Sequence, residues 1–353
     1  MKKYIALCFT CIFLVSCSSI PSVKNGQSLQ GYLDSISFSG SVLVSKEGKI
    51  IHSAGYGFSD KNLKTSNTPN TQFYIASLTK QFTAMAIMQL QENEKLNIND
   101  PIAQYLPNFP NGSLITIKQL LNHSSGLYDF TDKWEEIKTL NISTQNIVDM
   151  FKNEPLRFKP GSKVSYSSSG YILAGLLIEK VSGTSYSNYI ETHIFKPLKM
   201  SSSSYGYSNK MKTSKAIGYK DSVPQQSVNM SIPFSAGGLA SSVFDFYLWD
   251  RSFYDLSLIG KDSLDYMFPS DRSALGAGFG TGKFKVVMGL GWGIYETDFG
   301  AEYSHVGNVD GFSTVVSRYP DEKLLIVILS NEDRFNVLSL KNAIAKYVLS
   351  KQI

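Results

Sequence analysis

The serine and lysine of Ser77-Leu78-Thr79-Lys80 are well placed for chemistry, because they bring a hydroxyl and an amine within three positions of each other. They open an apolar segment, 77–94, whose hydrophobic side chains on nearly every face predict a buried helix. On a helix the two groups lie on one face. Burial disfavours the ammonium and the positive helix end favours an alkoxide, so the pair could exchange a proton as a serine nucleophile requires. The same residues also fit a capping serine followed by a lysine that extends to solvent.

Other chemistries find less support in the composition. All three cysteines fall within the first 17 residues, which excludes a disulfide, a thiolate metal site and a cysteine nucleophile in the rest of the chain. The histidines show no HExxH or HxH spacing, so we predict no metal site. They are His52, His123, His193 and His305. The net charge of +5 on 353 residues is small and dispersed, which argues against nucleic acid. A serine nucleophile needs no cofactor.

The N-terminus has the features of an export signal. Two lysines precede an apolar stretch, 4–15, that is too short to span a bilayer but suits a secretory signal. Its end, Leu14-Val15-Ser16-Cys17, resembles a bacterial lipobox, which implies cleavage before Cys17 and lipidation of that residue. We expect a signal peptide at 1–16, and at 17–34 the lipidated cysteine and a polar tether to a membrane of the bacterial cell envelope, facing the periplasm or the outside. An ordinary cleaved signal with an incidental cysteine is the alternative.

Both ends of the remaining chain are typical of strands, and its middle is typical of helices. The predicted strands are 40–45, 49–56, 313–318 and 324–330, and the predicted helices are 143–153, 170–181, 242–253 and 336–349. This order predicts an α+β protein, with an antiparallel sheet from both termini flanked by helices and a mostly helical second lobe inserted at roughly 85–235. We expect the runs 201–204 and 221–226 to be exposed loops.

Further motifs follow the Ser-x-x-Lys tetrapeptide. They are Leu120-Leu121-Asn122-His123-Ser124-Ser125-Gly126-Leu127, Lys159-Pro160-Gly161, Tyr166-Ser167-Ser168-Ser169-Gly170-Tyr171, Pro197-Leu198-Lys199-Met200, Ala236-Gly237-Gly238-Leu239-Ala240-Ser241 and His305-Val306-Gly307. In order and type they resemble the class C β-lactamase-like serine hydrolases. The resemblance implies a β-lactamase/D,D-peptidase-like fold over 35–353 and a hydrolase that forms an acyl-enzyme on amide or ester carbonyls. The family includes β-lactamases, D-alanyl-D-alanine peptidases, D-aminopeptidases and carboxylesterases.

The resemblance also implies roles for individual residues. Ser77 matches the family's nucleophile, Lys80 its first-motif lysine, and Tyr166 the tyrosine of its second motif, the partner that accepts the proton. A tyrosine with a pKa near 10 accepts a proton only where a cation stabilises the phenolate, so these side chains must converge. Literal Tyr-x-Asn triplets at Tyr186 and Tyr207 lack the preceding Pro-Gly turn, and we set them aside. The alternative for Tyr166 is a half-buried aromatic bonded to a loop.

Two positions depart from the lactamase pattern. Ser168 stands where those enzymes have the asparagine of Tyr-x-Asn, so the amide that would position the substrate is missing. His305 stands where they have the lysine of Lys-Thr-Gly, and a largely neutral imidazole should weaken the binding of a substrate carboxylate. The family's esterases and aminopeptidases show this His-x-Gly variant, so we expect a change of substrate and not a loss of acylation. The alternative for His305 is a histidine that caps a strand end.

An oxyanion hole completes the expected site. The resemblance places its two backbone N–H donors at Ser77 and at Asn308, one position after Gly307, on an edge strand that could also pair with an extended substrate. We interpret the loop around His123 as structural.

These inferences lead to one main hypothesis and its rivals. The main hypothesis is a β-lactamase-like or penicillin-binding-protein-like amide hydrolase of the cell envelope that acts on a small molecule or a peptidoglycan-like substrate. A small-ester carboxylesterase or a D-aminopeptidase of the same fold is the first alternative. A lipoprotein that keeps the fold without catalysis is the second. We expect a membrane contact through Cys17, and neither a metal nor a nucleic acid.

Overall fold

The computed structural model describes residues 20–350 apart from 25, 208–213 and 270–285. Our expectations for the signal peptide at 1–16 and for Cys17 therefore lie outside the described residues. Within the described part, none of the helices combines the length and the apolar character that crossing a bilayer demands.

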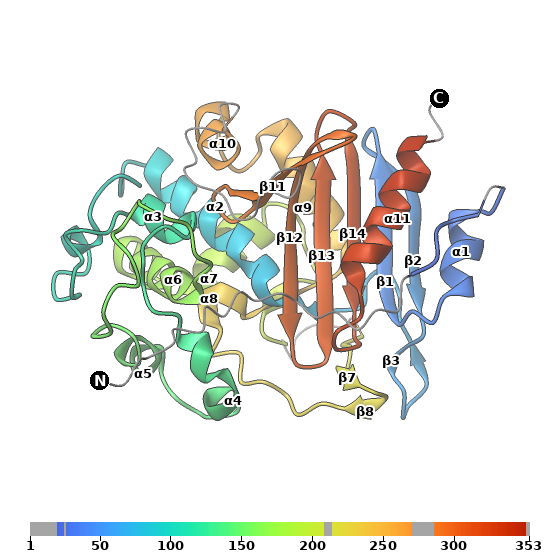
Figure 1. The fold of residues 1–353 in the computed structure, drawn as a ribbon, viewed down its shortest axis with the longest axis horizontal. Coiled ribbons are helices and arrows are strands. Elements are labelled where there is room, and N and C mark those ends of the chain that lie inside the picture. The colour runs from blue at the N-terminus through green and yellow to red at the C-terminus, as the bar shows by residue number, and fades with distance from the viewer. Residues whose placement is uncertain (1–19, 25, 208–213, 270–285, 351–353) are drawn as a thin grey trace, which may run out of the picture.

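A seven-stranded antiparallel sheet forms the centre of the molecule (Figure 1). In spatial order its strands are β10 (Val286–Met288), β11 (Gly293–Thr297), β12 (Gly300–Val309), β13 (Phe312–Tyr319), β14 (Leu324–Ser330), β1 (Gly40–Lys46) and β2 (Lys49–Tyr56). Because β1 pairs with β14, the expected sheet from both termini is confirmed. Glu47 and Gly48 take positive φ angles of 52° and 74°, as the two-residue turn between β1 and β2 requires.

Helices cover both faces of this sheet (Figure 1). On one face lie α1 (Leu29–Ser35) and α11 (Val337–Leu349), and on the other lies α9 (Val243–Asp255). The central strand β14 shows why both faces are covered. Ile326 and Ile328 pack with α11, whereas Leu325, Val327 and Leu329 pack into the core that contains α9. A strand that is buried on both faces has a continuous run of apolar residues, as β14 does.

The helix α1 lies within the range that we expected to be tether. Its apolar residues Leu29, Tyr32 and Leu33 follow the i, i+3, i+4 spacing of one helix face, and all three are buried in the core beneath α11. The Tyr32 hydroxyl also donates to the carbonyl oxygen of Pro21, 2.9 Å away. The folded domain therefore begins ahead of residue 35.

The second lobe is mostly helical, as predicted (Figure 1). Its helices are α2 (Thr79–Glu92), α3 (Ile117–Leu121), α4 (Trp134–Ile137), α5 (Thr144–Asp149), α6 (Ser168–Ser182), α7 (Tyr186–Ile190), α8 (Phe234–Gly237) and α10 (Lys261–Met267). Short 3₁₀ or π segments accompany them: η1 (Ala76–Leu78), η2 (Ile102–Gln104), η3 (Phe130–Lys133) and η4 (Glu191–Phe195). A small second sheet consists of β5 (Phe73–Tyr74), β9 (Leu239–Ser241) and β6 (Ser204–Tyr205). Strand β5 of this sheet leads directly into η1, which carries Ser77.

The run 201–204 corrects one expectation, because most of it is buried. Asp245, in the first turn of α9, accepts hydrogen bonds from the Ser202 N–H at 2.8 Å and from the Ser203 hydroxyl at 2.7 Å. A serine-rich segment can enter the interior when a carboxylate satisfies its polar groups. The run 221–226 is largely exposed, as expected, but it is not all loop, because Val223 and Pro224 form a short strand that pairs with Tyr219 and Lys220.

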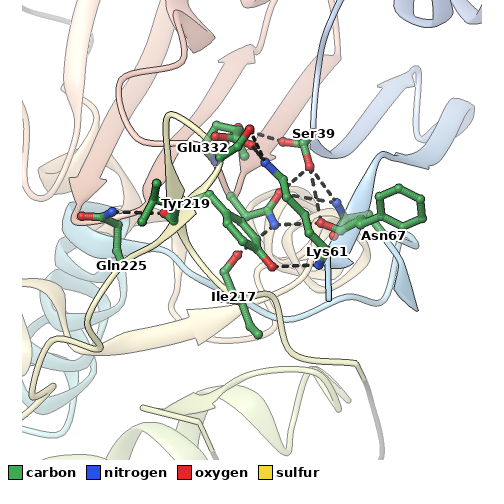
Figure 2. Close-up of polar contacts among 12 residues, drawn as sticks. Ser39, Lys61, Asn67, Ile217, Tyr219, Gln225 and Glu332 are labelled. Atoms are coloured by element: carbon green, nitrogen blue, oxygen red, sulfur yellow. Dashed lines mark hydrogen bonds and ion pairs between the residues drawn. The ribbon is translucent and has the colours of Figure 1, made fainter. Parts of the chain in front are cut away.

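A polar cluster ties two outer hairpins to the end of β14 (Figure 2). The hairpins are β3 (Phe58–Asp60) with β4 (Thr65–Ser66), and β7 (Tyr219–Lys220) with β8 (Val223–Pro224). Lys61 Nζ lies 2.5 Å from Glu332 Oε1. The side-chain amide of Asn331 donates to the carbonyl oxygens of Phe58 at 3.0 Å and Ile217 at 2.9 Å. These contacts have a structural role, because the Lys61 amine pairs with the Glu332 carboxylate and the Asn331 amide bonds to two main-chain carbonyl oxygens.

Candidate active site

The short helix η1 and the helix α2 position Ser77 and Lys80. Ala76 has a φ of 47°, in the left-handed region that non-glycine residues rarely adopt, so the chain turns sharply just before Ser77. Ser77 is partly exposed, whereas α2 is buried from Thr79 to Leu90, as its apolar pattern predicted. The hydroxyl therefore stands at the surface of a rigid, buried helix.

Lys80 lies beneath the serine and is fully buried. Its Nζ is 3.2 Å from Ser77 Oγ and 2.8 Å from the carbonyl oxygen of Ala236. Burial lowers the pKa of Lys80 to about 7, and the carboxylate of Asp129 opposes that shift. A large share of the amine is therefore neutral at physiological pH and able to accept a proton.

Tyr166 completes a group of three converging side chains. Its hydroxyl is hydrogen-bonded to Ser77, and Lys80 Nζ lies 4.9 Å from the centroid of its ring. Although the residue exposes 37% of its surface, the hydroxyl points into the site. Burial of this hydroxyl raises the pKa of Tyr166 above its usual 10, and the hydrogen bond with Ser77 offsets part of that rise. The phenol is therefore protonated at rest.

The two tyrosines that we set aside are engaged elsewhere. The Tyr186 hydroxyl forms a 2.7 Å hydrogen bond with Thr83 Oγ1 inside the helical lobe. The Tyr207 hydroxyl donates to the carbonyl oxygen of Ala216, 2.8 Å away. Of these three tyrosines it is Tyr166 whose hydroxyl lies at Ser77, and its role in the reaction stays a prediction.

His123 lies in the site, although we interpreted its loop as structural. Its ring stacks on Tyr166, and its Nδ1 accepts a hydrogen bond of 3.1 Å from the Ser167 N–H. Burial and the nearby charge of Lys80 lower the pKa of His123 well below 6.5, so its ring is neutral. Its position in the Asn-His-Ser-Ser-Gly motif, as one of four histidines, was the only available signal.

Ser168 and Asp129 meet at the start of α6. The Ser168 N–H donates to Asp129 Oδ2 at 3.0 Å, and Asp129 Oδ1 accepts from the Thr131 N–H at 3.1 Å. Ser168 exposes only 7% of its surface. Sequence reasoning missed Asp129, the carboxylate that acts on Lys80 and Tyr166.

His305, Gly307 and Asn308 lie on β12, next to Ser77. Pairing between β11 and β12 ends at Ser304, so within the described residues the far edge of the segment 305–309 is unpaired. A Cβ atom on Gly307 would lie 2.3 Å from the Ile75 carbonyl oxygen and 3.2 Å from the Ser77 nitrogen. Only glycine allows so close an approach of the two backbones. The oxyanion hole at Ser77 and Asn308 stays a prediction, for which this approach gives the required proximity.

His305 is buried on the site face of β12. Its Nδ1 is 2.8 Å from the carbonyl oxygen of Val306, and its ring centroid is 6.1 Å from that of Tyr166. Burial, with a smaller effect of the Lys80 charge, lowers the pKa of His305 to about 3. The ring is therefore neutral throughout the physiological range. Among the described residues, no group of three or more His, Cys, Asp or Glu side chains could hold a metal ion.

This fold, with Ser-x-x-Lys at the head of a buried helix, is the β-lactamase/D-aminopeptidase-like fold. Residues 30–348 match the family described as Beta-lactamase, so the chain belongs to that family. PbpX of Bacillus subtilis (strain 168) is 31% identical over 317 residues, which cover 88% of this chain and 75% of PbpX.

Solved structures show the same relationship. A penicillin binding protein from Bacillus halodurans is 27% identical with a TM-score of 0.76, over 88% of this chain and 96% of that one. A D-amino acid amidase from Ochrobactrum anthropi SV3 is 25% identical with a TM-score of 0.74, over 89% of this chain and 96% of that one.

Proposed function

We propose that the protein is a serine hydrolase that forms an acyl-enzyme through Ser77, on the amide or ester carbonyl of a small molecule or a peptidoglycan-like substrate. One observation carries this proposal: a buried amine and a phenol both contact the hydroxyl of a single, partly exposed serine. In the Ser-x-x-Lys arrangement the nucleophile and its base lie within hydrogen-bond reach, as nucleophilic catalysis requires. Membership of the Beta-lactamase family supports the same chemistry.

In the acylation step the Ser77 oxygen bonds to the substrate carbonyl carbon, and its proton passes to Lys80 Nζ. We expected Tyr166 to accept this proton, but the pKa directions favour Lys80, because the amine is lowered to about 7 while the phenol is raised. The tetrahedral intermediate then collapses, and the bond to the leaving nitrogen or oxygen breaks. The Tyr166 hydroxyl, hydrogen-bonded to Ser77, hands a proton to the leaving atom and is reprotonated from Lys80. Water then releases the acyl group.

Two substrate classes follow from the relatives and from the site. A β-lactamase-like or D-alanyl-D-alanine-peptidase-like amide hydrolase is the first, supported by the penicillin-binding relatives. An esterase or D-aminopeptidase is the second, and the neutral His305 favours it because a substrate carboxylate gains no cation there. The D-amino acid amidase among the structural relatives supports this second class. Rates on a chromogenic cephalosporin and on a short p-nitrophenyl ester separate the two.

Intact-mass detection of a covalent adduct tests the nucleophile. Wild-type protein treated with a fluorophosphonate or a penicillin is expected to gain the mass of one adduct, and Ser77→Ala is expected to gain none. Ser162→Ala, which changes an exposed serine in the loop before Tyr166, serves as the matched control and is expected to be labelled like wild type. Folded wild-type protein that reacts with neither probe would support the non-catalytic lipoprotein.

We also propose that Cys17 anchors the protein by lipid to a membrane of the bacterial cell envelope. The lipobox-like residues 14–17 support this proposal. In cells fed a labelled fatty acid, the wild type is expected to carry the label and to sediment with membranes. Cys17→Ser is expected to lose both properties, and a labelled Cys17→Ser protein would contradict the proposal.

A further inference from the structure

The contacts of His305 fix which of its ring nitrogens carries the proton. Nδ1 lies 2.8 Å from the carbonyl oxygen of Val306, and a carbonyl oxygen only accepts hydrogen bonds. Nδ1 therefore holds the hydrogen of the neutral ring, and this contact assigns the tautomer. The other nitrogen, Nε2, is left with a lone pair. Its role toward any neighbour is that of an acceptor.

This acceptor is buried and unused by the described part of the protein. Nε2 is one of the buried side-chain atoms for which the described residues supply no hydrogen-bond partner. Side chains alternate along a strand, so His305 lies on the same face of β12 as Gly307, which abuts the Ser77 nitrogen. A buried acceptor without a partner is unfavourable, and each such group in a native structure calls for an explanation.

The position of the acceptor points to the leaving-group side of the site. In the proposed mechanism the leaving atom receives its proton from Tyr166, so the leaving group departs on the Tyr166 side of Ser77. The His305 ring lies on that side, with its centroid 6.1 Å from the Tyr166 ring. The group that reaches Nε2 therefore belongs to the alcohol or amine that departs.

Charge decides which donor suits Nε2. A carboxylate brings only acceptor oxygens toward a lone pair, so it gains no bond here. An ammonium is a donor, but Lys80 becomes charged when it takes the Ser77 proton, and this charge beside the His305 ring would repel a second cation. A neutral hydroxyl donates one hydrogen bond without adding charge. Of the three groups, it matches the acceptor and its surroundings.

We propose that His305 Nε2 accepts a hydrogen bond from a hydroxyl on the leaving group, so that the preferred substrates release an alcohol or amine that carries a free hydroxyl in place of a carboxylate. This inference rests on the proposed function and names the substrate class of the same site. It gives the histidine at the third motif a positive role in specificity.

Three esters that share the same acyl group, acetyl, test the inference. Glycerol monoacetate carries a hydroxyl on the leaving group, n-propyl acetate carries neither group, and 3-acetoxypropanoate carries a carboxylate. With the wild type, kcat/KM is expected to be about tenfold higher for the glycerol ester than for the propyl ester, the size expected for one hydrogen bond. The carboxylate ester is expected to be the poorest of the three.

Two variants make the test specific to Nε2. His305→Lys is expected to reverse the order, so that the carboxylate ester overtakes the glycerol ester. His305→Leu is expected to bring the glycerol and propyl esters to equal kcat/KM. A merely structural role of His305 would lower all three rates in proportion, so the ratio between esters within each variant is the decisive readout. An unchanged ratio in both variants would overturn the inference.

The wild type alone separates the failure of this inference from the failure of the proposed function. A burst of p-nitrophenol from p-nitrophenyl acetate, one equivalent per site, reports acyl-enzyme formation on a leaving group without a donor. A burst together with equal rates on the glycerol and propyl esters overturns the inference and leaves the proposed function standing. If the wild type shows no burst and is not labelled by the fluorophosphonate, both the inference and the proposed function are overturned.

Discussion

The imidazole of His123 stacks on the ring of Tyr166, with the centroids 4.3 Å apart and the planes at 27°. The same histidine holds the backbone on both sides of that tyrosine, because its carbonyl oxygen accepts from the Ser165 N–H at 2.9 Å and its Nδ1 accepts from the Ser167 N–H at 3.1 Å. One buried residue therefore fixes both the ring and the peptide segment that presents it. His123 is a positioning residue for Tyr166.

Truncation of this histidine is expected to slow catalysis more than it weakens binding. His123→Ala removes the stacking surface and the acceptor, so kcat should fall about tenfold to a hundredfold with little change in KM, because a misplaced phenol transfers its proton poorly. His123→Asn keeps a side-chain acceptor and tolerates the φ of 61°, so it is expected to recover part of the loss. His193→Ala, which removes a histidine stacked on Tyr189, is the matched control. Equal kcat values for His123→Ala and His193→Ala would contradict the prediction.

The rate is expected to depend on pH through Lys80. Only the neutral amine accepts the Ser77 proton, and the pKa of Lys80 is lowered to about 7, so kcat/KM on a p-nitrophenyl ester should rise with pH and level off above about 8. Lys80→Arg stays charged at every pH used and is expected to lose the activity. A profile that is flat between pH 5.5 and 8.5 would rule out Lys80 as the base.

The same shift predicts how stability depends on pH. The pKa of Lys80 is lower in the folded protein than in the unfolded chain, so between about pH 7 and 10 the unfolded state binds the extra proton and stability rises with pH. Denaturant unfolding of wild type and Lys80→Met at several pH values isolates this contribution. From pH 7 to 9 the wild type should gain about 2 kcal/mol relative to the variant. Parallel curves for the two proteins would contradict the lowered pKa.

A buried ion pair joins the C-terminal helix α11 to the sheet. Lys341 Nζ lies 2.6 Å from Glu302 Oε1, and both side chains are about 95% buried. Lys341→Met removes the cationic partner of Glu302 and leaves the buried carboxylate only the hydroxyls of Ser317 and Tyr319 as donors, so the free energy of unfolding should fall by about 3 kcal/mol. Lys261→Met removes an exposed pair with Asp265 and is expected to change stability little. Similar melting temperatures for the two variants would show that Glu302 is not stabilised by Lys341.

Gly307 is expected to tolerate no side chain. In Gly307→Ala the new Cβ would meet the Ile75 carbonyl oxygen at 2.3 Å and Thr314 Oγ1 at 2.5 Å, which forces β12 away from Ser77. If an N–H of this strand stabilises the oxyanion, kcat/KM should fall about a hundredfold or more. Gly31→Ala, in the helix α1, meets only the Ser28 hydroxyl at 3.2 Å and is the control. Full activity of Gly307→Ala would exclude this strand from the oxyanion hole.

The sequence predicted those parts of the fold and the site that short-range patterns encode. The apolar residues after Ser77 predicted the buried helix, and the i, i+3 spacing predicted that Lys80 would reach the hydroxyl. Strand patterns at the two ends predicted a sheet that joins them. The Pro-Gly turn favoured Tyr166 over Tyr186 and Tyr207, and Tyr166 is the one of the three whose hydroxyl lies at Ser77.

The parts that were missed depend on contacts between segments far apart in the chain. The carboxylate of Asp129 accepts a hydrogen bond from Ser168 at the start of α6, and from there its charge acts on Lys80. The ring of His123 stacks on that of Tyr166. Our proposal of Lys80 over Tyr166 as the base rests on the burial of both groups, which lowers the pKa of the amine and raises that of the phenol, and no local pattern reveals this burial. The burial of the run 201–204 depends on hydrogen bonds to Asp245, which lies more than forty positions away in the sequence.

The pairing of β1 with β14 has a consequence for how the protein is made. About 280 residues separate Lys46 from its partner Leu324, so a growing chain cannot complete the sheet until β14 has been synthesised. At synthesis rates of about 5–20 residues per second, the N-terminal hairpin waits for at least about ten seconds without its neighbour. During that interval the edge of β1 that β14 later covers is exposed to chaperones, and the sheet is complete only after β14 has been synthesised.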